Sequence, residues 1–597
     1  MGPPRSVAII GGGLSGLSAA FYISRRFPAH TGTRIALVER SPRLGGWVRS
    51  ERVRVKDRYG RQADVLLESG PRTLRPTSKA IMELIHLLDL TPALLTVSRS
   101  APAARNRFLH IPGTKGLVAI PGSLPSLLVS PLAKILLPAM LRDVRRTDGV
   151  VLNASSSDES VDGFLTRHFG PDFARTLGSA LVHGIYAADS RQLSVRAAFS
   201  AMCRLEESGS GSVVRGALSE MLSSIRKRKS KSSATECTET YDLGEVDQLM
   251  KGVSVYSFRD GMQTLTDAIV RWLKQQEHVE LVQGDSAVSL NKTVDGQGFQ
   301  VTTSSGKQIV SSHLISAVPL PLLHNLLSSS ADTRQTSNSV HAQPASPPRP
   351  VTIATEHARK VPPPPFPHPA LSARSGRAGC YEPATVKSGS ESPYVSRTKA
   401  GVGSSALPLP LLPHLLTNPS SSVTVVNLVF PPCDTPIHPE GFGYLIPRPR
   451  LDYPSPLGSS LGILGTVFDS SALAGQDVSI SADHRSPRFT KVTVMLGGPY
   501  GPPSPDPQSS GFLPALLVAL VQHLGRSEPL PEPCLVRIRQ HQDCIPTPTV
   551  GHVVRMAELR AAVKETWGDN AAVIGAGVGG VSVGDCIESG RRVALEL

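Results

Sequence analysis

A chain of 597 residues is longer than one hydrophobic core usually organises, so we expect about two or three structural domains. Hydrophobic residues make up 40% of the chain and charged residues 18%, which excludes a wholly disordered protein. The net charge of +14 favours contact with anionic surfaces. The basic cluster at 225–231 lacks interleaved aromatic residues and a nucleic-acid motif, so it predicts a solvated loop and no nucleic-acid partner.

The seven cysteines lack the paired spacing of a disulfide framework or a zinc ribbon. This spacing favours a reduced or mitochondrial setting over secretion. One set approaches a metal site but contains no C-x-x-C or H-x-x-x-H pair, so we interpret it as packed or loop residues and expect no metal. The set consists of Cys534, His541, Cys544 and His552.

The N-terminal residues predict a complete βαβ nucleotide-binding unit. In such a unit the first glycine permits a tight turn, the second lets the backbone approach a pyrophosphate, and the third lets helix and strand pack closely. The helix N-terminus offers N–H groups to the phosphates, and Glu39 would accept hydrogen bonds from the ribose hydroxyls. Because the first strand starts at residue 7, we expect no cleavable targeting peptide. The elements are a strand at 7–10, a turn with Gly11, Gly13 and Gly16, a helix to about Phe27, and a strand at 34–38.

Two glycine-containing stretches after this unit favour a flavin over a nicotinamide cofactor. "RLGGWVRS" (43–50) places a glycine pair just past Glu39, where the backbone could approach the cofactor again. "LLESGPRTLRP" (66–76) adds another glycine turn. A permanently bound flavin often needs only a pocket, whereas NAD enzymes bring a donor or acceptor near the nicotinamide.

Residues 117–133 contain no charge, but Pro121, Pro125 and Pro131 interrupt them, so a continuous membrane-spanning helix is not expected. Together with the apolar and basic residues of 134–146, this stretch could form an interfacial membrane patch. A buried helical subdomain is an equally good interpretation of the same residues.

Two polar stretches interrupt the regular pattern. Residues 328–404 are rich in Pro, Ser and basic residues and predict a flexible insertion. Strand-like segments at 311–319 and 421–430 flank it, so the insertion interrupts a domain rather than separating two. A second stretch, at about 208–247, predicts an embellished loop.

The C-terminal glycines Gly575, Gly577 and Gly580 cannot begin a second nucleotide-binding unit. Only 17 residues follow Gly580, whereas a βαβ unit needs about 30. We therefore expect a strand at 571–574, a glycine turn and a helix from about Val581 to point backbone N–H groups at the flavin side of the cofactor bound by the N-terminal unit.

These blocks resemble the flavin amine oxidase superfamily and, within it, the branch that oxidises protoporphyrinogen. The resemblance rests on R-x-G-G after the βαβ unit, on "DCIESG" (585–590), and on "NRF" (106–108), "GFGYLIP" (441–447) and "VTVMLGG" (492–498). It covers the whole chain apart from the two polar insertions.

The resemblance implies an α/β and α+β fold: a Rossmann-like FAD-binding domain assembled from discontinuous segments, a mixed-sheet substrate domain and a helical membrane-binding domain. The implied bounds are FAD-binding segments at 1–90, 248–327 and 541–597, a membrane-binding domain at 91–210, insertions at 211–247 and 328–404, and a substrate domain at 405–540.

The resemblance also implies the residues of the site, with no metal and no certain catalytic group. Contacts to one non-covalent FAD are carried onto Gly11, Gly12, Gly13, Leu14, Ser15, Gly16, Glu39, Arg40, Arg43, Gly46, Trp47, Gly70, Pro71, Arg72, Thr73, Ala287, Ala576, Val581, Ser582, Val583 and Asp585. Substrate contacts are carried onto Arg107, Ala188, Phe442, Leu445, Leu464 and Met495. Ala188 departs from the pattern, because the family often has glycine there, and its methyl group puts the substrate fit at that edge in doubt.

The implied reaction is the oxidation of protoporphyrinogen IX to protoporphyrin IX, the penultimate step of haem biosynthesis, with three O2 reduced to three H2O2. The implied location is peripheral on the mitochondrial inner membrane, and a homodimer and contact with ferrochelatase are left open. Two alternatives remain: another flavin oxidase or desaturase of the superfamily, and a flavin-free protein resembling the GDP-dissociation inhibitors.

Overall fold

The computed structural model describes residues 4–146, 158–229, 241–337, 412–454, 460–479 and 488–597. Residues 1–333 and 407–597 form one compact unit, and 334–406 are assigned to a second. The fold is described here for the first unit. The predicted insertion at 328–404 lies outside the described residues except at its start, where α14 (Leu320–Ser337) continues as a helix.

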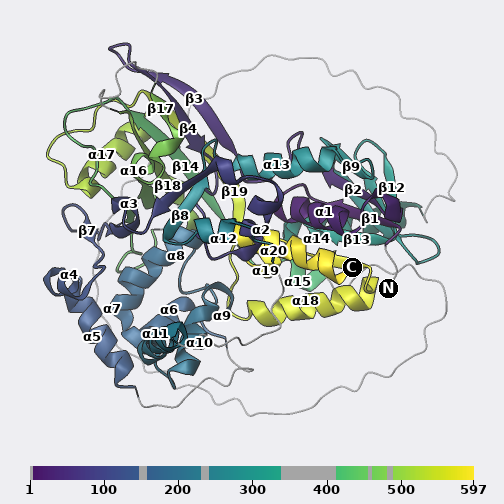
Figure 1. Cartoon of the computed structure of the whole chain (residues 1–597), viewed down its shortest axis with the longest axis horizontal. Helices are drawn as coiled ribbons and strands as arrows, with labels where there is room; N and C mark the ends of the chain where they lie inside the picture. The colour runs from purple at the N-terminus through teal and green to yellow at the C-terminus, as the bar shows by residue number, and fades with distance from the viewer. Residues whose placement is uncertain (1–3, 147–157, 230–240, 338–411, 455–459, 480–487) are drawn as a thin grey trace, which may run out of the picture. The chain divides into compact units, whose positions relative to one another are not determined.

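A five-stranded parallel sheet draws its strands from three separate parts of the chain (Figure 1). The helix α1 (Leu14–Arg26) connects the first two strands, which confirms the predicted N-terminal βαβ unit. The last strand pairs with the strand before the insertion, so the C-terminal glycine segment does complete the N-terminal domain, as predicted. In spatial order the strands are β20 (Ala571–Val573), β13 (His313–Ser316), β1 (Ser6–Ile10), β2 (Arg34–Glu39) and β9 (Val279–Gln283).

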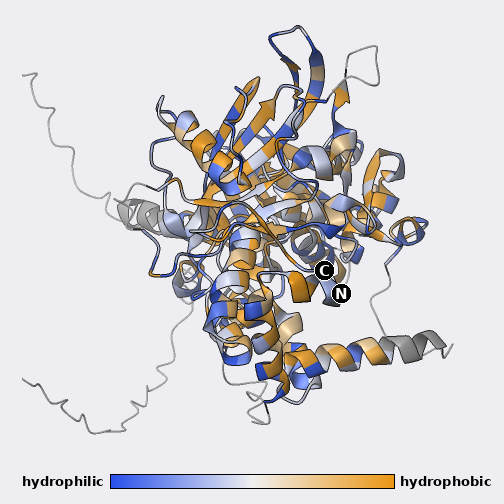
Figure 2. Cartoon of the chain, turned by 90° about the vertical axis from the view of Figure 1, so that its left-hand side faces the viewer, coloured by the Kyte–Doolittle hydropathy of each residue, from blue (hydrophilic) through white to orange (hydrophobic). Residues whose placement is uncertain are grey.

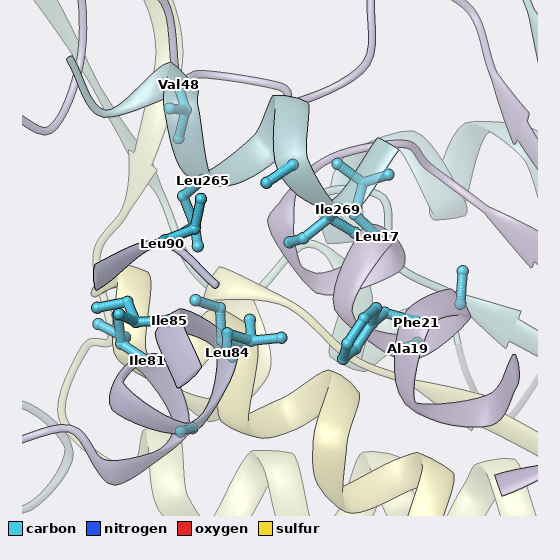
Figure 3. Packing of buried hydrophobic residues seen from close by; sticks show 14 of the residues in the cluster. Leu17, Ala19, Phe21, Val48, Ile81, Leu84, Ile85, Leu90, Leu265 and Ile269 are labelled. Carbon is cyan, nitrogen blue, oxygen red and sulfur yellow. The ribbon is translucent and has the colours of Figure 1, made fainter. Parts of the chain in front are cut away.

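Helices cover both faces of this sheet, and the alternation of side chains along β1 shows how. Val7 and Ile9 join a core built with α1, α2 (Lys79–Leu87), α13 (Gln263–Lys274) and α20 (Val583–Glu596). Ala8 and Ile10 join a second core with α18 (His552–Trp567). Figure 3 shows side chains of α1, α2 and α13 in the first core. Because β1 is buried on both faces from Val7 onward, its residues after Ser6 are all apolar, as is typical of a central parallel strand.

A seven-stranded mixed sheet forms the other large layer of the unit. The strand after the insertion, β14, belongs to this sheet, whereas β13 before the insertion belongs to the parallel sheet. The insertion therefore interrupts the compact unit but joins two different sheets. In spatial order the strands are β19 (Leu535–Pro546), β14 (Ser420–Phe430), β18 (Thr490–Gly497), β16 (Ile463–Val467), β15 (Gly443–Leu445), β6 (Phe108–Leu109) and β7 (Val118–Ala119).

Three smaller sheets complete the strand content of the described residues. They are β3 (Ser50–Lys56) with β4 (Gln62–Glu68) and β17 (Val478–Ser479), β5 (Leu94–Ser98) with β8 (Val253–Phe258), and β10 (Ala287–Lys292) with β11 (Phe299–Thr303) and β12 (Gln308–Ser311). The helix α17 (Phe512–Leu524) packs its buried side chains against one face of the seven-stranded sheet.

A helical region follows β7. As predicted, the chain at 117–133 forms no continuous helix, because α4 (Leu124–Val129) ends before α5 (Ala133–Val144) begins. No helix among the described residues has both the length and the apolar character needed to cross a membrane. The other long helices are α6 (Val161–Phe169), α8 (Ser179–Tyr186), α10 (Ser200–Ser208) and α11 (Val213–Lys229).

The predicted loop at 208–247 is wrong over much of its length, because α11 occupies Val213–Lys229 and α12 occupies Val246–Leu249. The polar composition suggested a loop, but α11 packs along α10, and tertiary packing stabilises a helix that composition alone did not indicate. The basic cluster at 225–231 begins inside this helix, and residues 230–240 lie outside the described residues.

A buried ionic cluster ties the helical region together. His168 of α6 is fully buried, with Nδ1 2.5 Å from Asp143 Oδ1 of α5 and Nε2 3.2 Å from Glu206 Oε1 of α10. Asp143 also accepts hydrogen bonds from the Ser212 hydroxyl and the Val214 amide. Burial alone would lower the pKa of His168, but the two carboxylates outweigh it and raise the pKa. The pKa of Glu206 falls to about 2, because hydrogen bonds from His168 and Arg167 overcome the effect of its burial.

We predict that His168→Gln destabilises this region by about 3 kcal/mol, since removing His168 leaves the buried Asp143 carboxylate without its charged partner. The charged His168 contributes stability below its unfolded pKa of about 6.5, and this is lost as pH rises through its raised folded pKa. Glu206 contributes above its unfolded pKa, and this is lost as pH falls toward 2. Thermal unfolding at several pH values should show that the thermal stability of the parent protein declines above pH 6.5. The variant should lack this decline. Parallel curves for both proteins would contradict the assignment, and His86→Gln, at a half-exposed histidine, is the control.

Candidate functional site

The glycine turn after β1 is closed by contacts that leave no room for side chains. A Cβ on Gly16 would lie 1.9 Å from the carbonyl oxygen of Gly11, and Gly11 itself has a φ of +105° that favours glycine. At Gly13 the situation is the opposite, because a Cβ there would meet no atom within 4 Å. Gly13 is also the N-cap of α1, which has no side-chain cap. The turn therefore leaves an open space in front of an uncapped helix N-terminus, which is the arrangement that binds phosphate groups.

Glu39 lies at the end of β2, beside this turn. Its Oε2 accepts a hydrogen bond from the Gly12 amide at 2.7 Å, and its Oε1 accepts one from the Ser41 amide at 2.9 Å. Each carboxylate oxygen has a second lone pair, so Glu39 can still accept hydrogen bonds from ribose hydroxyls, as the sequence predicted.

The predicted second glycine stretch returns to the same turn. The Gly45 amide donates to the Gly12 carbonyl at 2.8 Å, and a Cβ on Gly46 would lie 3.2 Å from the Gly13 Cα. The Arg43 guanidinium donates to the carbonyls of Leu44 and Val48, both at 2.9 Å. In this structure Arg43 therefore shapes its own loop and brings its two glycines against the turn.

Gly70 and Trp47 lie against each other, because a Cβ on Gly70 would be 2.4 Å from the Trp47 carbonyl. The Trp47 ring is half exposed and packs edge-on against His541 of β19, with 5.4 Å between ring centroids. The His541 Nε2 is 3.0 Å from the Ser69 carbonyl. These contacts join the second glycine stretch, the third one and the seven-stranded sheet at one place.

Arg72 is buried, and its Nη1 has no hydrogen-bond partner among the described residues, with Asp469 Oδ1 at 3.6 Å. A buried guanidinium nitrogen without a hydrogen bond costs free energy, so it indicates an acceptor supplied by a bound molecule. Pro71 and Thr73, on either side, are half-buried.

Glu68 was missed by the sequence prediction and is buried beside Arg72. Its carboxylate accepts hydrogen bonds from the Met262 amide and the Ser50 hydroxyl, both at 2.8 Å, and so ties together three segments of the candidate flavin site. Burial is the largest effect on Glu68 and raises its pKa to about 7 despite those bonds. A carboxylate ending the apolar run of β4 was the sequence signal that could have found it.

The C-terminal segment reaches the same turn from the other side. A Cβ on Gly575 would come within 4.0 Å of the Ser15 hydroxyl and 3.8 Å of the Ala317 carbonyl. Ala576 follows directly as the first residue of α19 (Ala576–Gly579). Ser582 and Asp585 form a capping box at the start of α20, in which the Asp585 Oδ2 accepts from the Ser582 hydroxyl at 2.7 Å. The structure therefore gives Asp585 a helix-capping role.

The remaining predicted flavin residues divide into two groups. Leu14 and Val583 pack against the core of the parallel sheet, and Val581 packs against the helical core that contains Ala188. Arg40 is exposed just after β2, and Ala287 begins β10 of a three-stranded sheet. The residues just before Ala287 contact the site: the Gly284 amide donates to the Ser41 carbonyl at 3.0 Å, and the Asp285 amide donates to the Glu39 carbonyl at 3.2 Å.

A cavity of about 640 Å³ opens beside His541 and Ala188. Its walls come from the turn after α8, the start of β14, the turn after β18 and the middle of β19. Most wall residues are polar, and Val423 connects them to an apolar cluster that contains Leu464 and Met495. Ala188 does line this cavity, at the position where the family pattern has glycine.

Three predicted substrate residues lie on one face of the seven-stranded sheet. Leu445 of β15 is paired with Gly465 of β16, and Gly465 is paired with Met495 of β18, so the row has a gap at its centre. Leu464 is the extra residue of a β-bulge and packs in one cluster with Met495. A Cβ on Gly184 of α8 would lie 2.7 Å from Leu445, which shows how closely α8 covers this face. Gly184 and Gly465 were missed, because a single glycine inside a helix or strand carries no positional signal.

Phe442 and Arg107 lie apart from that row. Phe442 packs in a small cluster with Leu473, and its amide donates to the Asn106 carbonyl at 2.9 Å. Arg107 is exposed at the start of β6 and has no ion-pair partner among the described residues. Partial burial and the nearby Arg75 lower the pKa of its guanidinium. The structure therefore brings Leu445, Leu464 and Met495 together. Arg107, just before β6, lies beside Phe442, just before β15.

Comparison with known proteins agrees with this geometry. The family model for flavin containing amine oxidoreductases matches residues 14–356. A protein of Schizosaccharomyces pombe named protoporphyrinogen oxidase is 27% identical, over 99% of this chain and 98% of its own length. The Homo sapiens protein of the same name is 28% identical, over 99% of this chain and 98% of its own. A crystal structure from Exiguobacterium sp. 255-15 has the same fold, with a TM-score of 0.62 and 18% identity over 99% of this chain and 98% of that chain.

We predict that Gly13→Val folds normally but purifies without flavin. The backbone at Gly13, with a φ of −75°, accepts valine, and the space around it is open, so only a bound dinucleotide would clash with the side chain. Flavin absorbance and circular dichroism measure the two effects separately. Gly122→Val, at another glycine with open surroundings, should keep the flavin. Full flavin content in Gly13→Val would contradict the placement of the cofactor, and Gly16→Ala should instead fail to fold.

Proposed function

The chain belongs to the flavin-containing amine oxidoreductase family, and on this premise we propose that it oxidises protoporphyrinogen IX to protoporphyrin IX with O2 as the acceptor. The observation that carries the proposal is the full-length likeness to relatives named protoporphyrinogen oxidase. The apolar, glycine-gapped face of the seven-stranded sheet supports it, because a flat macrocycle needs a broad apolar surface with few polar anchors.

Family membership implies FAD, and the residues present fit this cofactor. The open space at Gly13, which is also the uncapped start of α1, and the buried Arg72 Nη1 without a hydrogen bond are two separate features that a bound dinucleotide would account for. Glu39 would hold the ribose, and the Gly45–Gly46 pair and Gly575 would border the cofactor on either side. When bound, FAD supplies an acceptor for hydride from the substrate and a donor of electrons to O2.

The protein's own part in this chemistry is positioning. Oxidation removes six electrons from the substrate, three O2 become three H2O2, and growing conjugation drives each loss of hydride. No acid or base is required, since the pyrrole protons can leave to water. The residues that matter are therefore those that hold a large flat molecule near the flavin: Leu445, Leu464 and Met495 by apolar contact, Phe442 at the adjoining strand end, and Arg107 by charge.

Domain bounds and location follow as parts of the same proposal. The segments 1–90, 248–327 and 541–597 supply the flavin domain, 405–540 the substrate domain and 91–210 a region that binds a membrane surface. The exposed apolar residues of α4 and α5 support the last assignment: Leu128 is 70% exposed, Val129 86% and Leu141 54%. In the lower part of Figure 2, hydrophobic and hydrophilic residues lie side by side on the same helices. We propose a peripheral position on the mitochondrial inner membrane.

The direct test is purification in detergent, followed by a flavin spectrum and an assay for porphyrin fluorescence. A yellow protein that produces fluorescent protoporphyrin supports the proposal. A yellow protein that acts only on amines or carotenoids, or a colourless protein, would contradict it.

Arg107→Ala should retain FAD and folding but raise KM, because we propose that this arginine binds a substrate carboxylate. The expected loss in kcat/KM is about 1.5 to 3 kcal/mol, typical of a hydrogen bond to a charged group. Lysine should restore only part of it, since it lacks the planar fork of arginine. Arg105→Ala, at an exposed arginine in the preceding helix, is the control.

Esterified propionates give the decisive comparison for Arg107. The parent enzyme should lose activity on the ester, whereas Arg107→Ala should hardly distinguish ester from acid. If both proteins discriminate equally, Arg107 is a surface arginine and not part of the substrate site.

Membrane association should weaken when Leu128 and Leu141 are both replaced by glutamate. Each leucine is exposed and could bury its side chain in lipid, so we expect about tenfold weaker binding to vesicles with unchanged flavin content. Val310→Glu, at an exposed apolar residue of β12, is the control. Leu127 is buried, so a charge there should disturb folding instead. Unchanged vesicle binding of the double variant would exclude this surface.

A further inference from the structure

Among the residues that line the cavity the carboxylates outnumber the cations, and we call the part of the lining that holds these charged residues its acidic end. Asp189 and Asp543 line it together with Arg191. Arg191 Nη2 is 2.6 Å from Asp189 and 2.8 Å from Asp452, so two carboxylates share one guanidinium. Asp543 has no ion-pair partner within the described part of the chain.

The other titratable groups near the acidic end do not compensate the negative charge of its carboxylates. Burial lowers the pKa of His541, and its hydrogen bond to the Ser69 carbonyl only partly opposes this, so the ring is neutral at neutral pH. Arg448, the next cation along, is paired with Asp162 at 2.8 Å. Arg107 is not among the residues that line the cavity. The acidic end and the proposed carboxylate anchor are therefore made by different parts of the fold.

Tyr453 also lines the cavity at its acidic end, and a buried histidine binds its hydroxyl group. Its hydroxyl is 2.8 Å from Nε2 of His183, and Nδ1 of His183 is 2.7 Å from the Ile446 carbonyl. A carbonyl only accepts hydrogen bonds, so Nδ1 carries the proton, and Nε2 accepts from the Tyr453 hydroxyl. Burial lowers the pKa of His183 to about 4, which keeps the ring neutral and this arrangement constant near neutral pH.

The Tyr453 ring is fixed as well as its hydroxyl. It packs edge-on against Tyr500 with 5.0 Å between centroids, and the Arg191 guanidinium lies 5.6 Å from its centroid. Asp452, the residue before it, is held by Arg191. The result is a rigid wall with an apolar ring and an acidic border.

We propose that Tyr453 and Asp543 determine substrate selectivity. They admit a tetrapyrrole that has an edge without carboxylates, and they reject a tetrapyrrole that has a carboxylate on every ring. This inference rests on the proposed function and deepens it. A carboxylate brought to this end would meet Asp543 and the Asp189–Asp452 pair, with one shared guanidinium to offset them. An uncharged, vinyl-bearing edge meets no such repulsion and can pack against the Tyr453 ring.

The test compares protoporphyrinogen IX, with two carboxylates, and coproporphyrinogen III, with four, in the full-length enzyme loaded with FAD. Asp543→Asn should raise kcat/KM for coproporphyrinogen about tenfold and leave protoporphyrinogen within about twofold. Added salt should reduce the discrimination of the parent enzyme more than that of the variant. Asp434→Asn, at an exposed carboxylate outside the cavity, should change neither ratio.

Tyr453→Phe tests the wall separately, because it removes only the hydroxyl that His183 holds. It should relax the preference for protoporphyrinogen while flavin content stays normal, and Tyr453→Ala should relax it further. Tyr444→Phe is the matched control: its hydroxyl is also paired with a histidine, His523, at 3.0 Å, but its side chain packs in the core under α17. That control should change thermal stability and not selectivity.

Binding provides a readout independent of turnover, since quenching of porphyrin fluorescence can be titrated with protoporphyrin IX and coproporphyrin III. If Asp543→Asn and Tyr453→Phe both discriminate between the two substrates as the parent enzyme does, the inference is overturned. The proposed function stands in that case if the parent enzyme is active. A parent enzyme that oxidises neither porphyrinogen overturns the proposed function and the selectivity wall together.

Discussion

The approach of two backbone segments at the first glycine turn is the constraint on which the site depends. Gly16 lies so close to the Gly11 carbonyl that no side chain fits between them, and Ala317, at the end of β13, closes the turn from the side. This contact sets where α1 begins relative to β1, and thereby where its uncapped N-terminus points. Glu39 and Gly46, from the segment after β2, and Gly575, from the C-terminal segment, then reach the same turn.

Buried charged residues join the segments that the turn brings together. Glu68 links β4 to Ser50 and Met262, and Lys491 of β18 donates to the Leu66 carbonyl and to Asp477 at 2.6 and 2.7 Å. Each of these groups is costly to bury alone, but each has its partners within hydrogen-bond distance. Lys491 thereby restricts how β4 can lie against the seven-stranded sheet, because a displacement would leave its charge unpaired.

The two faces of the seven-stranded sheet have different tasks. One face carries Val426, Val494 and Tyr444 into a closed core with α17. The other carries the row of Leu445, Leu464 and Met495, and α8 covers Leu445 there. Because side chains alternate along a strand, the same strands serve as core on one side and as candidate binding surface on the other. The β-bulge at Leu464 adds one apolar residue to the face that carries Met495.

Local patterns in the sequence determined the parts whose causes are local. The spacing of Gly11, Gly13 and Gly16 predicts the strand, turn and helix that the structure contains, since a tight turn at that place needs glycine whatever surrounds it. The proline spacing at 117–133 likewise predicts the break between α4 and α5. The shortage of chain after Gly580 predicts that the C-terminal strand joins an existing sheet, which is a consequence of length alone.

Only the tertiary structure decided the features that arise where distant segments meet. The helix α11 forms because α10 and α5 give it a surface to pack on, which polar composition could not indicate. The roles of Glu68, His183 and Tyr453 depend on partners far away in the sequence, and no spacing rule connects residues 183 and 453. The part of Asp585 in the capping box of α20 is likewise seen only in the structure, while its predicted cofactor contact stays a prediction. Sequence patterns specify backbone conformation over a few residues, whereas burial and pairing of charges are properties of the assembled fold.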